Sequence, residues 1–133
     1  MATTFTLAID FDGTIVEAAY PEIGAPIKDA FSTLIRLQNE GHRLILWTYR
    51  SGETLKAAVD FCLKNGIEFY AVNKNFPEEQ MEEDISRKIL ADYYIDDRSI
   101  EGLPDWNTIY ELIQKYREER SNNSKKKGFF KWR

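Results

Sequence analysis

Short apolar runs alternate with longer amphipathic stretches along the chain. The short runs predict four buried strands, at Thr4–Ile9, Arg43–Thr48, Ile67–Val72 and Ala91–Ile95. The longer stretches carry apolar residues at helical spacing and predict helices, at Ile27–Glu40, Glu53–Asn65, Pro77–Leu90 and Asp105–Arg120. Strands that alternate with helices are typical of right-handed βαβ units and a parallel sheet. We therefore expect an α/β fold, a three-layer Rossmann-like sandwich with a mainly parallel sheet of four or more strands.

Polar residues follow the predicted strands at the point where each strand ends: Asp10 and Asp12, Thr48, Asn73, and Asp96 and Asp97. Ligands of open parallel sheets bind beyond the carboxyl ends of the strands. Carboxylates brought together there repel one another unless one is protonated or a cation lies between them. Oxygen ligands of this kind suit a hard divalent ion, so the pattern predicts a Mg²⁺ site.

The charge of the chain is divided unevenly. Residues 121–133 contain five basic residues and no acid, which leaves 13 basic against 22 acidic residues in the first 120. We interpret residues 1–120 as one catalytic domain and residues 121–133 as a basic-aromatic tail. Phosphate contacts require clustered Lys and Arg, so an acidic body disfavours a broad nucleic-acid-binding face, and no nucleic-acid partner is expected.

Other classes are disfavoured by composition. The single cysteine, Cys62, cannot form an internal disulfide, and it lies on the apolar face of a predicted helix, as an inert core residue would. The longest apolar runs are too short for a transmembrane helix, and the first residues lack the pattern of a signal peptide. A cytoplasmic protein is expected. The lone histidine, His42, follows a helix stop and is interpreted as a solvated turn residue.

Residues 10–14, Asp-Phe-Asp-Gly-Thr, resemble the first motif of the haloacid dehalogenase (HAD) superfamily of phosphohydrolases. Thr48, after an apolar strand, resembles the second motif, and Lys88, eight positions before Asp96, resembles the third. Ile95-Asp96-Asp97 resembles the acidic fourth motif.

The resemblance implies a Mg²⁺-dependent phosphatase with a role for each of these residues. Asp10 is implied as the nucleophile that forms an aspartyl-phosphate, and Asp12 as the general acid and base. Thr48 is implied to bind the phosphoryl oxygens, and Lys88 to neutralise charge. The metal ligands implied are Asp10, Asp12 through its backbone carbonyl, Asp96 and Asp97, the last as direct or outer ligand.

Neither gap between the motifs is long enough for the cap domain that many members of this superfamily carry. The resemblance is therefore to a minimal, capless member whose loops contact the leaving group. Four loop residues are candidate substrate contacts: Tyr20, Arg50, Asn73 and Asn75. Arg50 is interpreted either as a site for a second anionic group or as a residue of a surface salt bridge. An open site accepts large substrates or borrows a neighbouring subunit as a lid. The basic-aromatic tail is interpreted either as a flexible terminus or as a segment that docks on an acidic face, on a membrane surface or on a neighbouring subunit, in which case a homo-oligomer would supply the lid.

Two other functions are compatible with clustered acids in an α/β fold. A signalling receiver domain carries its phosphorylated Asp on a middle strand, with Thr and then Lys afterwards. Here Asp96 and Asp97 come after both Thr48 and Lys88, which disfavours a receiver. A non-catalytic phosphate-binding scaffold is the second alternative, and it is disfavoured because each expected catalytic residue type is present.

Overall fold

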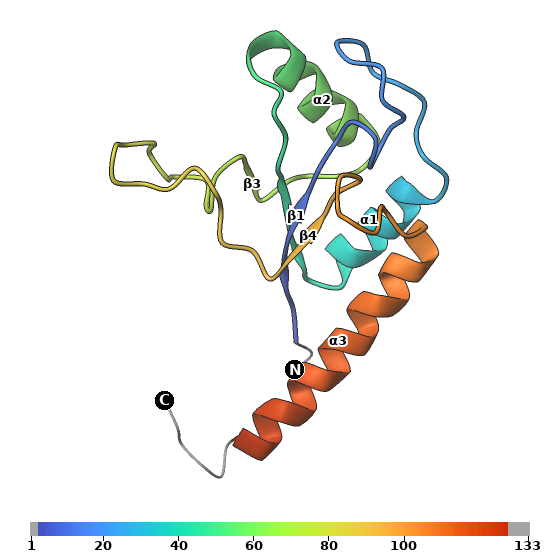
Figure 1. Ribbon diagram of the computed structural model, residues 1–133, viewed down its shortest axis with the longest axis vertical. Coiled ribbons are helices and arrows are strands. Elements are labelled where there is room, and N and C mark those ends of the chain that lie inside the picture. Colours follow the sequence, from blue (N-terminus) through green and yellow to red (C-terminus); the bar gives the residue numbers. More distant parts are fainter. Residues whose placement is uncertain (1–2, 128–133) are drawn as a thin grey trace.

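The computed structural model describes residues 3–127 and confirms the predicted α/β fold. The strands are β1 (Thr6–Ile9), β2 (Arg43–Leu46), β3 (Ala71–Val72) and β4 (Tyr93–Ile95), and the helices are α1 (Ala30–Asn39), α2 (Gly52–Lys64) and α3 (Trp106–Lys127). All four strands are parallel and lie in the order β3-β2-β1-β4 (Figure 1). Within residues 3–127 no cap domain interrupts this Rossmann-like sheet.

The side chains of each strand alternate between two faces of the sheet, as the pleat requires. Leu7 and Ile9 of β1 join a large buried cluster that also contains side chains of α1, α2 and α3. Ala8, between them, joins a smaller cluster on the opposite face, together with Ile45 and Ile89. The three helices therefore share one face of the sheet, and the chain that includes Ile89 covers the other.

The direction of the connections explains this arrangement. The chain steps from β1 to β2 to β3 in one direction and then passes back over β2 and β1 to reach β4. Right-handed crossovers that run in opposite directions lie on opposite faces of a sheet. The connection from β3 to β4 is thus the third layer, and the order of strands reverses between β1 and β4.

The predicted helix over Pro77–Leu90 is wrong, because residues 73–92 form turns and bends (Figure 1, yellow segment). Glutamates at positions 78, 79, 82 and 83 would place like charges four residues apart in a helix, which is destabilising. Asn75 closes the segment as a loop: its side-chain carbonyl accepts a hydrogen bond from the N–H of Leu90 at 2.7 Å, and its amide groups donate to Glu79.

Helix α3 is longer than predicted and runs to Lys127, into the segment interpreted as a tail. It lies along α1, where the guanidinium carbon of Arg36 sits 4.0 Å from the centre of the Tyr110 ring (Figure 1). Residues 128–133, which carry the aromatic part of the tail, lie outside the described residues. No helix within residues 3–127 is both long and apolar enough to cross a membrane.

His42 was expected in solvent, and the structure corrects this expectation. Gly41, with φ +98°, ends α1 as predicted, and the N–H of His42 then donates to the carbonyl of Leu37 at 3.2 Å. This turn carries the imidazole inward, where it is 4% exposed and its Nδ1 accepts a hydrogen bond from the N–H of Phe5 at 2.9 Å. Cys62 lies in the core, as expected.

Candidate functional site

The candidate site lies at the carboxyl ends of β1 and β4, where the strand order reverses. The N–H of Asp10 donates to the carbonyl of Ile95 at 3.0 Å, so the residues that come after the two strands start side by side. In open α/β sheets this switch point is the usual place for a ligand. The acids found in the sequence at the ends of β1 and β4 are therefore brought to one edge of the sheet.

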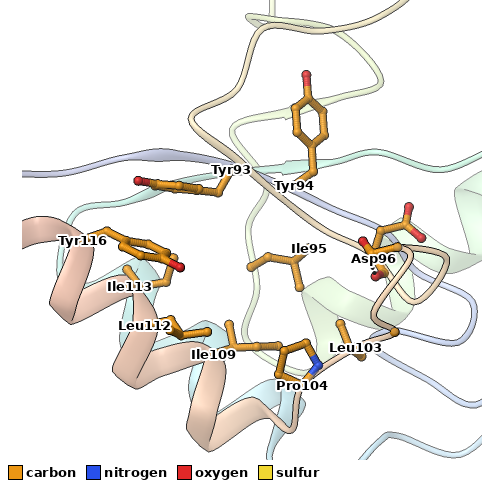
Figure 2. Close-up of a pocket in the computed structure, with 12 residues that line it drawn as sticks. Tyr93, Tyr94, Ile95, Asp96, Leu103, Pro104, Ile109, Leu112, Ile113 and Tyr116 are labelled. Atoms are coloured by element: carbon orange, nitrogen blue, oxygen red, sulfur yellow. Dashed lines mark hydrogen bonds between the residues drawn. The ribbon is translucent and has the colours of Figure 1, made fainter.

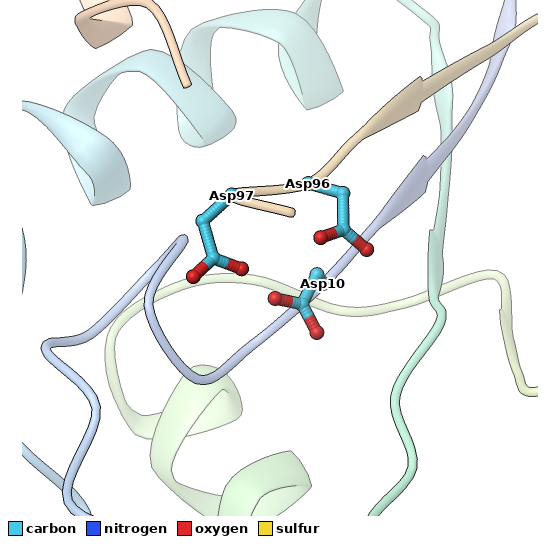
Figure 3. A group of neighbouring side chains, drawn as sticks. All are labelled: Asp10, Asp96 and Asp97. Atoms are coloured by element: carbon cyan, nitrogen blue, oxygen red, sulfur yellow. The ribbon is translucent and has the colours of Figure 1, made fainter. Parts of the chain in front are cut away.

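Three carboxylates converge at this edge. Asp10, Asp96 and Asp97 each offer an oxygen, and these oxygens lie within 4.8 Å of one another (Figure 3). Burial raises the pKa of Asp10 to about 7, against the hydrogen bond from Thr14, which lowers it; the charge of Asp96 and a hydrogen bond with Asp97 raise it further. Burial and the neighbouring acids therefore both disfavour the ionised form of Asp10.

Thr14 links two of these acids and was passed over as a site residue in the sequence. Its hydroxyl donates to Asp10 Oδ2 at 2.9 Å and accepts a hydrogen bond from the N–H of Asp97 at 3.0 Å. The side chain is fully buried, and Trp106 of α3 fixes its backbone by donating from Nε1 to the Thr14 carbonyl at 3.0 Å. The signal in the sequence was its place as the last residue of Asp-Phe-Asp-Gly-Thr.

Gly13 gives the loop its close approach to β4. Its φ of +84° lies in the left-handed region, and a Cβ built there would stand 2.2 Å from Asp97 Oδ2. A side chain at this position would occupy the space that the Asp97 carboxylate uses. Glycine therefore allows Asp97 to turn toward Asp10.

The carboxylate of Asp12 lies outside the cluster because Arg50 holds it. Arg50 donates from Nε to Asp12 Oδ2 at 2.8 Å and from a terminal nitrogen to Asp12 Oδ1 at 2.7 Å. The Arg50 side chain is fully buried and also donates to the carbonyls of Pro21, Glu22 and Thr54. The hydrogen bonds to Asp12 raise the pKa of the Arg50 guanidinium. Arg50 thus forms a buried ion pair, which corrects the expectation of a surface salt bridge.

A cavity of about 630 Å³ opens onto the acids, a volume typical of small-molecule sites. The residues that line it are Asp10, Asp12, Ala18, Tyr20, Trp47, Thr48, Tyr49, Asp96, Asp97 and Arg98. It includes six of the ten residues singled out in the sequence. Arg98, an exposed cation, was not among them.

The remaining candidates have other places. Asn73 accepts a hydrogen bond from the N–H of Thr48 at 2.8 Å. It therefore positions the backbone of Thr48 and does not itself line the cavity. Asn75 is engaged in closing the loop before β4. Lys88 does not line the cavity; it is exposed, and its ammonium lies 5.5 Å from the centre of the Tyr94 ring. Residues 73–92 form turns and bends instead of the predicted helix, and in this loop Lys88 lies away from the cavity.

Mg²⁺ is the ion that the resemblance implies for this cluster. Asp10, Asp96 and Asp97 present only carboxylate oxygens, the ligand type that Mg²⁺ requires. Burial is the main cause of the raised pKa of Asp10, and the charge of Asp96 adds to it, so a cation at the cluster would favour the ionised form of Asp10. The residues therefore fit a hard divalent ion. The backbone carbonyl of Asp12 as a further ligand stays a prediction.

A second hollow, of about 190 Å³, lies between β4 and α3 (Figure 2). Apolar side chains such as Ile95, Ile109 and Ile113 line it, and Tyr93 stacks on Tyr116 with ring centres 4.9 Å apart. Asp96 stands at its edge as the one acidic residue of its lining. This hollow lacks converging polar groups, so the chemistry of the site belongs to the cavity over Asp10.

The comparisons with known proteins identify one relationship. A solved structure of a conserved protein from Bacteroides thetaiotaomicron shares 53% sequence identity with this chain at a TM-score of 0.81, over 86% of this chain and 93% of the other. No family model matches the chain, and a search of curated proteins finds no match. This similarity shows the fold, and it gives no information about the reaction. The chain belongs to the same family as this conserved Bacteroides protein.

Proposed function

We propose that the protein is a Mg²⁺-dependent phosphomonoester hydrolase of the HAD type, with Asp10 as the nucleophile. The observation that carries the proposal is the convergence of the carboxylates of Asp10, Asp96 and Asp97 within 4.8 Å at the switch point of the sheet, inside a cavity that Thr48 also lines. This arrangement matches the residue types and the order of motifs that the sequence shares with the HAD superfamily. Bound Mg²⁺ would offset the charge of the carboxylates and of the phosphoryl group.

In the first step, a carboxylate oxygen of Asp10 attacks phosphorus. The bond from phosphorus to the ester oxygen breaks, its electron pair stays on the leaving oxygen, and the carboxyl of Asp12 supplies a proton to that oxygen. In the second step, water attacks the phosphorus of the aspartyl-phosphate and gives a proton to Asp12. Inorganic phosphate leaves and the Asp10 carboxylate is restored.

The ion pair with Arg50 bears on the role of Asp12. A carboxylate held by a guanidinium is a proton acceptor, which is what the second step requires. Donating a proton in the first step requires the Asp12 side chain to exchange Arg50 for the leaving oxygen. Asp12 lines the cavity, so a rotation of its side chain brings the carboxyl toward bound substrate.

Lys88 supports the proposal least. The HAD resemblance assigns it the neutralisation of charge on the phosphoryl group, yet it lies on the ring of Tyr94 and outside the cavity. Arg98 is the cation that lines the cavity over Asp10, and we include it in the proposal as the group that balances phosphoryl charge. The position of Lys88 favours the second candidate function, a non-catalytic phosphate-binding scaffold.

One experiment separates the two functions. Purified protein is incubated with Mg²⁺ and 4-nitrophenyl phosphate, and release of phosphate is followed with and without a chelator. We expect Mg²⁺-dependent turnover that Asp10→Asn abolishes. Asp60→Asn, which removes an exposed carboxylate of α2, is the matched control and retains activity. No turnover with Mg²⁺, or full activity of Asp10→Asn, would refute the hydrolase.

A further inference from the structure

Two tyrosines stand at the mouth of the cavity over Asp10. Tyr20 comes from the loop between β1 and α1, and Tyr49 lies in the loop after β2. Their ring centres are 5.1 Å apart with planes at 52°, and both side chains line the cavity. Tyr20 is 48% exposed and Tyr49 is 68% exposed. Large aromatic faces are thus presented to solvent beside the acids rather than buried in the core.

The buried ion pair under the site holds Tyr20 in place. The guanidinium carbon of Arg50 lies 5.1 Å from the centre of the Tyr20 ring and 5.1 Å from the centre of the Phe11 ring. The guanidinium therefore contacts both rings, and Arg50 also donates to the carbonyls of Pro21 and Glu22 in the same loop as Tyr20. Contacts of this kind between a cation and aromatic faces are attractive. Tyr20 is consequently positioned next to Asp12 before any ligand binds.

We infer that Tyr20 and Tyr49 form a subsite for a flat aromatic ring in the leaving group of the substrate. This inference rests on the proposed hydrolase and names its substrate class: phosphate monoesters of alcohols that carry an aromatic ring. Arg50 holds Asp12 and also contacts the Tyr20 ring, which links the tyrosine pair to the residue that protonates the leaving oxygen in the proposed reaction. Aromatic pairs gain affinity beyond the area they bury, through offset or edge contacts of their rings.

The rest of the cavity wall favours an aromatic ring over a sugar. A sugar exposes several hydroxyl groups, each of which needs a hydrogen-bonding partner when it is buried. Away from the acids, Thr48 and Arg98, the wall consists of Ala18, Trp47 and the two tyrosines. Apart from the two phenolic O–H groups and the indole N–H, this wall offers ring faces and a methyl group. A flat apolar ring fits this chemistry.

The test compares two esters that differ in flatness and not in leaving-group chemistry. 2-Phenylethyl phosphate and 2-cyclohexylethyl phosphate both release a primary alcohol with a ring of six carbons. For the wild-type protein with Mg²⁺ we expect kcat/KM to favour the phenyl ester by about three- to tenfold. Tyr49→Ala brings this ratio close to one, and Tyr49→Phe, which keeps the ring, retains it. Phe76→Ala is the matched control, because Phe76 is an exposed aromatic residue outside the cavity lining.

The outcomes are distinguishable from those of the proposed hydrolase. Turnover of both esters with a wild-type ratio near one, or a ratio unchanged in Tyr49→Ala, overturns the aromatic subsite and leaves the hydrolase standing. If neither ester is turned over, the result counts against the hydrolase. In that case, NMR measurements with 2-phenylethylphosphonate decide the subsite: contacts between its ring protons and the ring of Tyr49 support it, and binding without such contacts, or no binding, overturns it.

Discussion

Arg50 holds Asp12 through two parallel hydrogen bonds, of 2.8 and 2.7 Å, with the Arg50 side chain fully buried and the Asp12 side chain 7% exposed at the cavity wall. The remaining nitrogen–hydrogen groups of Arg50 meet backbone carbonyls of the loop at Pro21 and Glu22 and of helix α2 at Thr54. One guanidinium therefore joins two parts of the connection between β1 and α1, at Asp12 and at Pro21 and Glu22, to the start of α2. The pair links the stability of the fold to the position of a proposed catalytic group.

Removing the guanidinium will leave the Asp12 carboxylate buried without its partner. Breaking a buried ion pair in this way costs about 3–5 kcal/mol, so Arg50→Ala should lower the free energy of unfolding by an amount in that range, measured by urea denaturation. Lys56→Ala is the control, because Lys56 forms an exposed pair with Asp60 at 3.0 Å. An exposed pair of this kind contributes about 0.5 kcal/mol or less.

A double-mutant cycle tests whether the effect belongs to the pair. If it does, Arg50→Ala combined with Asp12→Ala will lose less stability than the sum of the two single variants. Additive losses, or an Arg50→Ala variant as stable as Lys56→Ala, would contradict the buried ion pair.

The hydroxyl of Thr14 should be needed to hold Asp10 and Asp97 in their positions in the acid cluster. Thr14→Val preserves the shape of the side chain and removes both the hydrogen bond to Asp10 and the partner of the Asp97 N–H. An unsatisfied buried donor costs about 1–3 kcal/mol, so we expect a loss of unfolding free energy in that range. We also expect Mg²⁺ to raise the melting temperature less than in the wild type.

Thr14→Ser and Thr33→Val complete this test. Serine retains the hydroxyl, so Thr14→Ser should keep most of the Mg²⁺ effect. Thr33→Val makes the same substitution at a buried threonine of α1 and should leave the Mg²⁺ effect unchanged. A Thr14→Val variant with the full Mg²⁺ effect would show that Thr14 does not position the acids.

The sequence predicted the sheet and the acids at its edge because both are local properties. A short apolar run ending in Asp10 and Asp12 specifies a buried strand with carboxylates at its carboxyl end. A parallel sheet places the carboxyl ends of all its strands at one edge, and the strand order then sets the end of β1 beside the end of β4. The candidate metal cluster could therefore be anticipated without knowledge of how the loops fold.

The features that could not be anticipated depend on contacts between distant segments. Arg50 lies 38 residues after Asp12, and nothing in its neighbourhood distinguishes a buried partner from a surface cation. His42 comes after a helix-ending glycine, a position typical of exposed turns, yet the Phe5 N–H needs an acceptor there. The position of Lys88 was missed because acidic repulsion and Asn75 turn residues 73–92 into a loop.

A side chain at position 13 should disrupt the cluster directly. In Gly13→Ala the new Cβ would stand 2.2 Å from Asp97 Oδ2, so Asp97 must move away from Asp10. The left-handed backbone adds a cost of about 1 kcal/mol for alanine. We expect a loss of unfolding free energy above that value, together with loss of Mg²⁺ binding measured by calorimetry.

Gly102→Ala separates the effect of the clash with Asp97 from the effect of the left-handed backbone. Gly102 has φ +78° but has open space where a Cβ would be, so its substitution carries the backbone cost without the clash. It should lose about 1 kcal/mol and keep Mg²⁺ binding. Equal effects of the two variants on Mg²⁺ binding would mean that Gly13 is needed for its backbone alone.

The buried imidazole of His42 should make stability depend on pH. Burial lowers its pKa below the ordinary value of 6.5, assisted by the charge of Arg117, because the charged form loses hydration. In the unfolded chain the ordinary value applies. Its stabilising contribution is therefore complete above pH 6.5 and is lost as the pH falls from 6.5 toward the lowered pKa, with a slope of at most about 1.4 kcal/mol per pH unit.

The effect of His42 can be isolated by comparison with a variant that does not titrate. Asp10 acts in the opposite sense in an overlapping range, because its pKa is raised from 3.8 to about 7 and its burial costs stability as the pH rises between these values. The difference between wild type and His42→Gln removes this common contribution. Urea denaturation at pH 5, 6, 7 and 8 should show that the wild type gains more stability than His42→Gln between pH 5 and 7, and that the difference is constant above pH 7. Parallel profiles over the whole range would show that folding does not lower the pKa of His42.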